Sequence, residues 1–284
     1  MELCLNRSTL DSATPPDVFV HAARSAGFRA VELSSARLRE AVARSPELCR
    51  IFTEGEVVPV HGGWNVRMHW PRERFFAAVG DVDGAMAFAV SLGSRSGTLD
   101  LPRPPLGDDP HRWRDDMIER LRAIGRLAVR NGLRVMLEFN GLWNRDASTD
   151  TGYRTLRAAV ELVEEADVPS LGVLLDTFHW HASAGTAQDL AAIPSGLPIF
   201  VHVNDAPPLP LDQLDDAQRR LPGEGVIALN EFLTALADRG HEGPLSIELK
   251  TPELHAMEPT KAARHVHTVV SRTLGAFVEA EAQV

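Results

Sequence analysis

The chain has 284 residues and a formal net charge of −10 at pH 7. This acidic balance argues against nucleic acid as a partner, because non-specific binding to a phosphate backbone depends on basic side chains. The two cysteines form no CxxC pair, and the sequence has neither a signal-peptide pattern nor a membrane-spanning stretch. We therefore expect a cytoplasmic protein without disulfides and without a membrane partner.

Short apolar runs with flanking turn residues recur along the whole chain and predict β-strands. They lie at residues 2–6, 30–33, 57–61, 96–100, 134–139, 171–176, 199–203 and 245–249. The longest irregular stretch, residues 205–228, is rich in proline and glycine. A loop of this length in a compact domain is more often functional than idle.

Helical patterns lie between most of these strands. The first predicted helix covers residues 15–26, with Thr14 as N-cap, Pro15 at its first position and Gly27 as its stop. The same capping logic starts a helix at Pro110, behind Asp109, and ends it at Gly132. Further helices are expected around residues 156–163, 230–239 and 259–279.

Eight βα repeats with short connections predict a single-domain (β/α)8 TIM barrel over residues 1–284. A doubly wound sheet is the alternative. It is less favoured because no glycine-rich loop follows the first strand.

Four polar residues, Glu138, Asp176, His202 and Glu248, lie inside or at the ends of predicted strands five to eight. A carboxylate in an apolar strand is costly unless it is paired or binds a cation. Neighbouring strands are about 4.8 Å apart, so inward-pointing side chains at their carboxyl ends can share one ion. The pattern predicts one divalent metal ion, with Mn²⁺, Mg²⁺, Co²⁺ and Zn²⁺ all compatible with these ligands.

Each of these residues also has a plainer interpretation. A single strand-end carboxylate is more often a helix cap or part of a loop salt bridge, and His202 alone could be a core histidine with satisfied hydrogen bonds. The metal interpretation is favoured because four such residues coincide on successive strands.

The chain resembles the xylose-isomerase-like TIM barrels, which include sugar and cyclitol isomerases and epimerases, and in particular their inosose isomerase branch. The DxFHxH and RxxPGxG patterns in series are the more specific features. The resemblance lies in ELCLNRSTL (2–10), LEFNG (137–141), LGVLLDTFHWHASAG (171–185), VHVNDAP (201–207), RRLPGEG (219–225) and SIELKTPEL (246–254).

The resemblance implies a function as well as a fold. Glu138, Asp176, His202 and Glu248 would be the metal ligands, and the substrate would be a small keto-sugar or keto-cyclitol. Glu138 and Glu248 would move a proton between adjacent carbons through an enediolate, as general base and acid. Pure ligation by these glutamates, with water or His179 moving the proton, is the alternative.

Four residues are predicted to bind the substrate. His179 follows Asp176 by three residues and could donate to a substrate oxygen or support a ligating carboxylate. Arg219 matches the family arginine that reaches substrate oxygens, although Arg220 competes for this role. His61 and Trp64 follow the third strand and could line the pocket, or simply pack beneath a loop.

Several alternatives stay open at this point. A dehydratase could use the same scaffold and the same first proton abstraction, whereas a non-catalytic binding module would be expected to lose a ligand. A DNA-repair endonuclease of the same fold needs further histidine and aspartate ligands that the sequence does not offer. The stretch 61–74 and Lys250 depart from the inosose isomerase pattern, so the particular substrate is open, as is the formation of a homo-oligomer.

Overall fold

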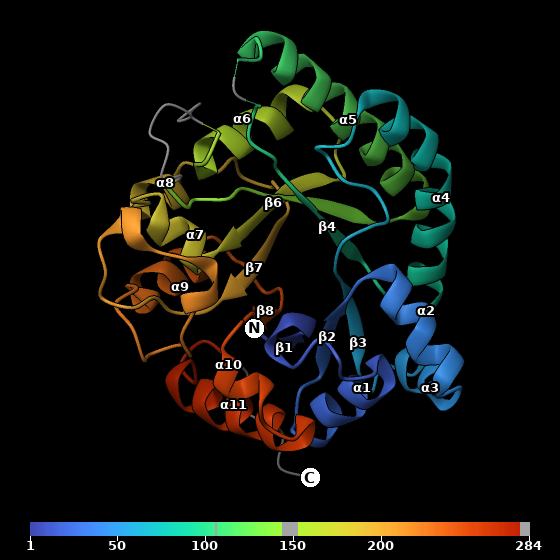
Figure 1. Ribbon diagram of the computed structural model, residues 1–284, viewed down its shortest axis with the longest axis vertical. Helices are drawn as coiled ribbons and strands as arrows, with labels where there is room; N and C mark the ends of the chain where they lie inside the picture. Colours follow the sequence, from blue (N-terminus) through green and yellow to red (C-terminus); the bar gives the residue numbers. More distant parts are fainter. Residues whose placement is uncertain (106, 144–152, 279–284) are drawn as a thin grey trace.

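The predicted barrel is confirmed. The computed structural model describes residues 1–105, 107–143 and 153–278, apart from the side chain of His61. Within these residues eight parallel strands pair in the order β3-β2-β1-β8-β7-β6-β5-β4, which forms a nearly closed barrel surrounded by helices (Figure 1). The strands are β1 Leu3–Asn6, β2 Ala30–Leu33, β3 Val58–His61, β4 Ser96–Asp100, β5 Arg134–Glu138, β6 Leu171–Asp176, β7 Ile199–Val203 and β8 Leu245–Ile247.

The helices mostly follow the capping pattern of the sequence. In α5 the side chain of Asp109 accepts the backbone N–H of His111 at 3.0 Å, and Gly132 ends the helix with a left-handed φ of 68°. The helices are α1 Pro16–Ser25, α2 Ser35–Arg44, α3 Glu47–Thr53, α4 Arg72–Ser91, α5 Pro110–Asn131, α6 Leu156–Ala166, α7 Thr177–Ala182, α8 Ala187–Ala191, α9 Leu229–Asp238, α10 Pro252–His255 and α11 Pro259–Thr273. None of the helices in the described ranges is long and apolar enough to span a membrane.

Two helix boundaries differ from the prediction. The first helix begins at Pro16, so Pro15 and not Thr14 occupies the N-cap position. Two consecutive prolines both fit the start of a helix, and the sequence does not distinguish between them. The last helix, α11, ends at Thr273, earlier than the predicted end near residue 279, which lies outside the described residues.

The barrel interior explains why the polar residues converge. Small and apolar side chains from different strands form a layer inside the barrel: Cys4, Ala30, Val60, Met136, Leu174 and Phe200. Side chains alternate between the two faces of a strand, so the residue two positions later also points inward, one layer nearer the carboxyl end. Met136 is thus followed by Glu138, Leu174 by Asp176 and Phe200 by His202.

The long segment between β7 and α9 is held in place by Asp205. The carboxylate of Asp205 accepts backbone N–H groups of Gly223 and Gly225 at 3.0 Å each and of Ile227 at 2.9 Å. A Cβ atom at Gly225 would lie 2.2 Å from the carbonyl oxygen of Ala206, so this close approach requires glycine. The fixed loop carries Arg219 back toward the mouth of the barrel.

Candidate metal centre and active site

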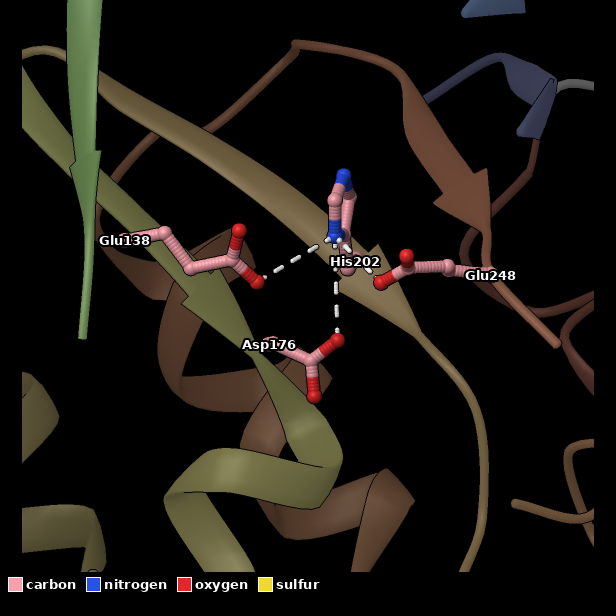
Figure 2. Close-up of side chains that lie close together, drawn as sticks. All are labelled: Glu138, Asp176, His202 and Glu248. Carbon is pink, nitrogen blue, oxygen red and sulfur yellow. Dashed lines mark ion pairs between the residues drawn. The ribbon is translucent and has the colours of Figure 1, made fainter. Parts of the chain in front are cut away.

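The structure brings the four predicted ligands together at the carboxyl ends of β5 to β8. Ligand atoms of Glu138, Asp176, His202 and Glu248 all lie within 4.8 Å of one another. Figure 2 shows the three carboxylates arranged around the Nδ1 atom of His202, which lies 3.7 Å from Glu138, 3.7 Å from Asp176 and 3.0 Å from Glu248. Three carboxylates and one imidazole form a donor set suited to a divalent cation.

A fourth carboxylate, that of Glu32, orients His202 from the other side of its ring. The Nε2 atom of His202 lies 2.9 Å from Glu32, whose Oε2 atom also accepts the hydroxyl of Ser246 at 2.6 Å. This contact gives the Nε2 atom its proton, as is common for metal-binding histidines. The Nδ1 atom is buried and has no hydrogen-bond partner among the described residues. The Nδ1 atom faces three carboxylates, so it can act as a metal ligand once a cation takes the place of its proton.

The two glutamates have opposite electrostatic environments. Burial raises the pKa of Glu138 to about 7, although the nearby His202 opposes this shift. Burial would also raise the pKa of Glu248, but Arg219 and His202 together hold it far below its ordinary value. The carboxyl of Asp176 behaves in the same way: burial would raise its pKa, but Arg219, His202 and His179 together lower it.

Arg219, not Arg220, reaches the cluster. The Nη1 atom of Arg219 donates to Asp176 at 2.5 Å and to Glu248 at 3.0 Å, and its side chain is 1% exposed. Arg220 is exposed, and its side chain binds only the carbonyl of Glu224 at 3.3 Å among the described contacts. Arg219 therefore lies at the cluster and Arg220 does not, while a substrate contact of Arg219 stays a prediction.

His179 lies beside the same arginine. Its Nε2 atom is 3.3 Å from Nη2 of Arg219, which can only donate, so Nε2 accepts and the proton lies on Nδ1. The Nδ1 atom is buried without a hydrogen-bond partner in the described part of the chain. His179 therefore has an N–H group for which none of the described residues supplies an acceptor oxygen.

The two predictions on the third strand have different outcomes. His61 ends β3, but its side chain lies outside the described part of the structure. Trp64 is 3% exposed and lines a separate small cavity together with Met68 and His69. Its role in substrate binding stays a prediction.

A pocket of about 490 Å³ opens over the cluster and is lined by Glu138, His202 and Glu248 together with residues after β1 and β2. This volume lies within the usual range for small-molecule sites, about 300–1,000 Å³. The ligand-bearing ends of the strands form the floor of the pocket.

Some contacts of the site were not predicted from the sequence. The carboxylate of Asp216 accepts a hydrogen bond from Nη2 of Arg219 at 2.7 Å, and the side-chain amide of Asn204 donates one to Asp176 at 3.1 Å. The hydroxyl of Ser8 lies 3.3 Å from Oε1 of Glu248. The spacing of three between Asp216 and Arg219 is the only local signal; the other contacts join distant segments.

Replacing Glu32 with glutamine is expected to weaken metal binding about 10- to 100-fold, the usual effect of removing the partner of a metal-binding histidine. Glutamine keeps the shape of the side chain but removes the charge beside Nε2 of His202. Competition with a fluorescent chelator, with Mn²⁺ or Zn²⁺ as the metal, measures the change. The exposed Glu231→Gln variant is the control, and equal affinities of the two variants would contradict the assigned role.

Metal affinity is also expected to fall as the pH is lowered. Burial lowers the pKa of His202, but Glu32 and Glu248 outweigh it and raise the pKa well above its ordinary value. A cation that binds at Nδ1 must therefore displace a proton from His202. Below pH 7 Glu138 is also mostly protonated, since its pKa is about 7, and metal binding must displace this second proton as well. Each displaced proton changes the affinity about tenfold per pH unit. Chelator competition between pH 6 and 8 tests this, and a flat profile would exclude it.

Comparison with known proteins places this geometry in a family. Residues 20–270 match the family described as xylose isomerase-like TIM barrel. An inosose isomerase from Halalkalibacterium halodurans is 30% identical over 144 residues, which are 51% of this chain and 49% of that protein. A 3-dehydroshikimate dehydratase from Pseudomonas putida is 34% identical over 135 residues, which are 47% of this chain and 20% of that protein. The matches thus span about half of the isomerase and a fifth of the dehydratase.

Solved structures agree in fold. The crystal structure of the IOLI protein with a bound zinc atom superposes with a TM-score of 0.85 at 21% identity, over 99% of this chain and 100% of that one. D-psicose 3-epimerase with D-tagatose, from Clostridium cellulolyticum H10, gives a TM-score of 0.75 at 17% identity, over 98% and 100% of the two chains. With the family match over most of its length, this chain belongs to the xylose isomerase-like TIM barrel family.

Proposed function

We propose that this chain is a divalent-metal-dependent isomerase or epimerase of a keto-sugar or keto-cyclitol. The observation that carries the proposal is the convergence of Glu138, Asp176, His202 and Glu248, with the buried Nδ1 atom of His202 facing the three carboxylates. The inosose isomerase relative and the zinc-containing IOLI structure support the substrate class and the presence of a metal. The identity of the metal stays open among Mn²⁺, Zn²⁺, Co²⁺ and Mg²⁺.

The proposed chemistry divides the work among the residues of the site. A bound divalent cation would polarise the substrate carbonyl and stabilise negative charge that develops on it. Glu248 and Glu138 would remove a proton from the carbon beside the carbonyl and return one to the adjacent carbon or to the opposite face. General acid–base catalysis of this kind contributes about 10²–10⁴-fold. His179 would donate its free Nδ1–H to a substrate oxygen, and Arg219 would hold Asp176 and Glu248 ionised.

A metal-dependent dehydratase is the second candidate. The similarity to 3-dehydroshikimate dehydratase and to inosose dehydratase from Klebsiella pneumoniae, 28% identical over 181 residues, favours it. Both reactions begin with the same proton abstraction beside a carbonyl. They differ in the next step, because a dehydratase expels a hydroxyl group β to the carbonyl and forms a conjugated enone.

Proton NMR in D₂O separates these functions. After elemental analysis of the purified chain, a panel of keto-inositols and ketoses is incubated with the protein and the metal found. Deuterium at the carbon beside the carbonyl, with product of unchanged mass apart from the label, is expected for an isomerase or epimerase. Loss of water with a new ultraviolet absorbance identifies the dehydratase. The absence of α-proton exchange over a broad panel would overturn the proposal.

A further inference from the structure

The charged side chains around the pocket are unevenly distributed. Apart from the carboxylates on its floor, Asp100 is the only acidic residue that lines the pocket among the described residues, and it pairs with Arg67 at 3.3 Å. Three basic side chains, Arg7, Arg37 and Lys250, line the same pocket. A cationic rim stands out in a chain whose net charge is −10.

Lys250 lies next to the reacting end of the site. Its ammonium group pairs with Asp216, and Nζ lies 3.9 Å from Oε1 of Glu248. An ammonium group has three N–H donors, so those not used by Asp216 remain available. The side chain is 35% exposed and lines the pocket, which lets Lys250 donate to a group bound beside Glu248.

Arg37 and Arg7 provide the second part of the rim. The Nη1 and Nη2 groups of Arg7 donate to four backbone carbonyls, at residues 10, 11, 12 and 14. Burial and the neighbouring Arg37 both lower the pKa of Arg7, so the two guanidinium groups repel each other. Arg37 pairs through Nη1 with Glu40 at 2.9 Å, and its side chain is 44% exposed. Its other N–H groups can therefore bind an anion at the rim.

We propose that the pocket selects a substrate that carries a carboxylate or phosphate group, and that Lys250 and Arg37 bind this group. The inference rests on the proposed function, because it concerns the substrate of the same site. Charge-assisted hydrogen bonds to an anion are about twice as strong as neutral ones, so an anionic substituent uses this rim better than a hydroxyl group. Lys250 occupies a position where the inosose isomerase pattern leads us to expect an apolar residue, which agrees with a different substrate.

The test measures binding by calorimetry with the full chain in its metal-containing form. The probes are a ketose, its terminal phosphate ester and the corresponding keto-uronate. At least one of the two charged probes is expected to bind at least about ten times more tightly than the ketose. The charged probe with the higher affinity shows whether the pocket prefers a phosphate or a carboxylate group. Lys250→Met and Arg37→Met are each expected to weaken binding of that probe about 10- to 100-fold, the usual value of a hydrogen bond to a charged group, and to weaken ketose binding by a clearly smaller factor.

The controls separate substrate contact from loop support. Lys261→Met removes the other, exposed lysine and is expected to bind all probes as the parent does. If Lys250→Met weakens the ketose and the charged probes equally, Lys250 only supports Asp216 and the inference is wrong. Equal binding of all probes to the parent, or no binding at all, also overturns it. Proton exchange in D₂O on the same samples distinguishes failure of this inference from failure of the proposed function.

Discussion

Replacing Glu248 with glutamine is expected to lower kcat about 10²–10⁴-fold, the usual contribution of a general acid–base group. Glutamine keeps the size of the side chain and one oxygen for the metal, but it cannot take a proton at neutral pH. The Oε2 atom of Glu248 faces His202 and Arg219, whereas Oε1 faces Ser8 and Lys250 on the pocket side. In the proposed mechanism, the Oε1 atom would therefore be the one that receives the substrate proton.

Metal loss and loss of proton transfer must be separated in this variant. Turnover is measured at a metal concentration that saturates both proteins, and bound metal is determined on the same samples. Glu253→Gln, an exposed change shortly after the strand, is the control and is expected to leave kcat unaltered. Turnover of the Glu248 variant close to that of the parent would show that this residue only ligates the metal.

The ligand cluster could be predicted because it depends on local patterns. Each ligand lies in or just after an apolar strand, and the side-chain period of two fixes whether it points inward. Glu138 and Asp176 end β5 and β6, His202 lies within β7, and Glu248 follows the last residue of β8. Once the barrel is recognised, these positions place all four at one end of its interior.

The supporting contacts could not be predicted, because they join residues far apart in the chain. Glu32 and His202 are 170 positions apart, and the pairing depends on the tilt and closure of the barrel. Arg219 lies in a loop whose course is fixed by Asp205 and by glycines that allow close backbone approach. The sequence therefore favoured Arg219 without excluding Arg220, and the folded loop shows which of the two reaches the cluster.

Replacing Arg219 with methionine is expected to lower the free energy of unfolding of the chelator-treated protein by about 3–5 kcal/mol, the cost of leaving a buried charge unpaired. Asp176 is fully buried, and Arg219 is its guanidinium partner, with Glu248 as a second one. The substitution fills a similar volume but leaves three carboxylates, including Asp216, without their shared cation. Urea unfolding in the presence of a chelator measures the loss.

A divalent metal should reverse part of this destabilisation, because it would supply positive charge to the carboxylates of Asp176 and Glu248. The difference between parent and Arg219→Met is therefore expected to be smaller when both proteins are saturated with metal than in chelator. Arg220→Met is the matched control, since Arg220 is exposed and its loss should change stability by no more than about 0.5 kcal/mol. If Arg219→Met is as stable as Arg220→Met in chelator, or if metal leaves the deficit unchanged, Arg219 does not balance the charge of the metal site.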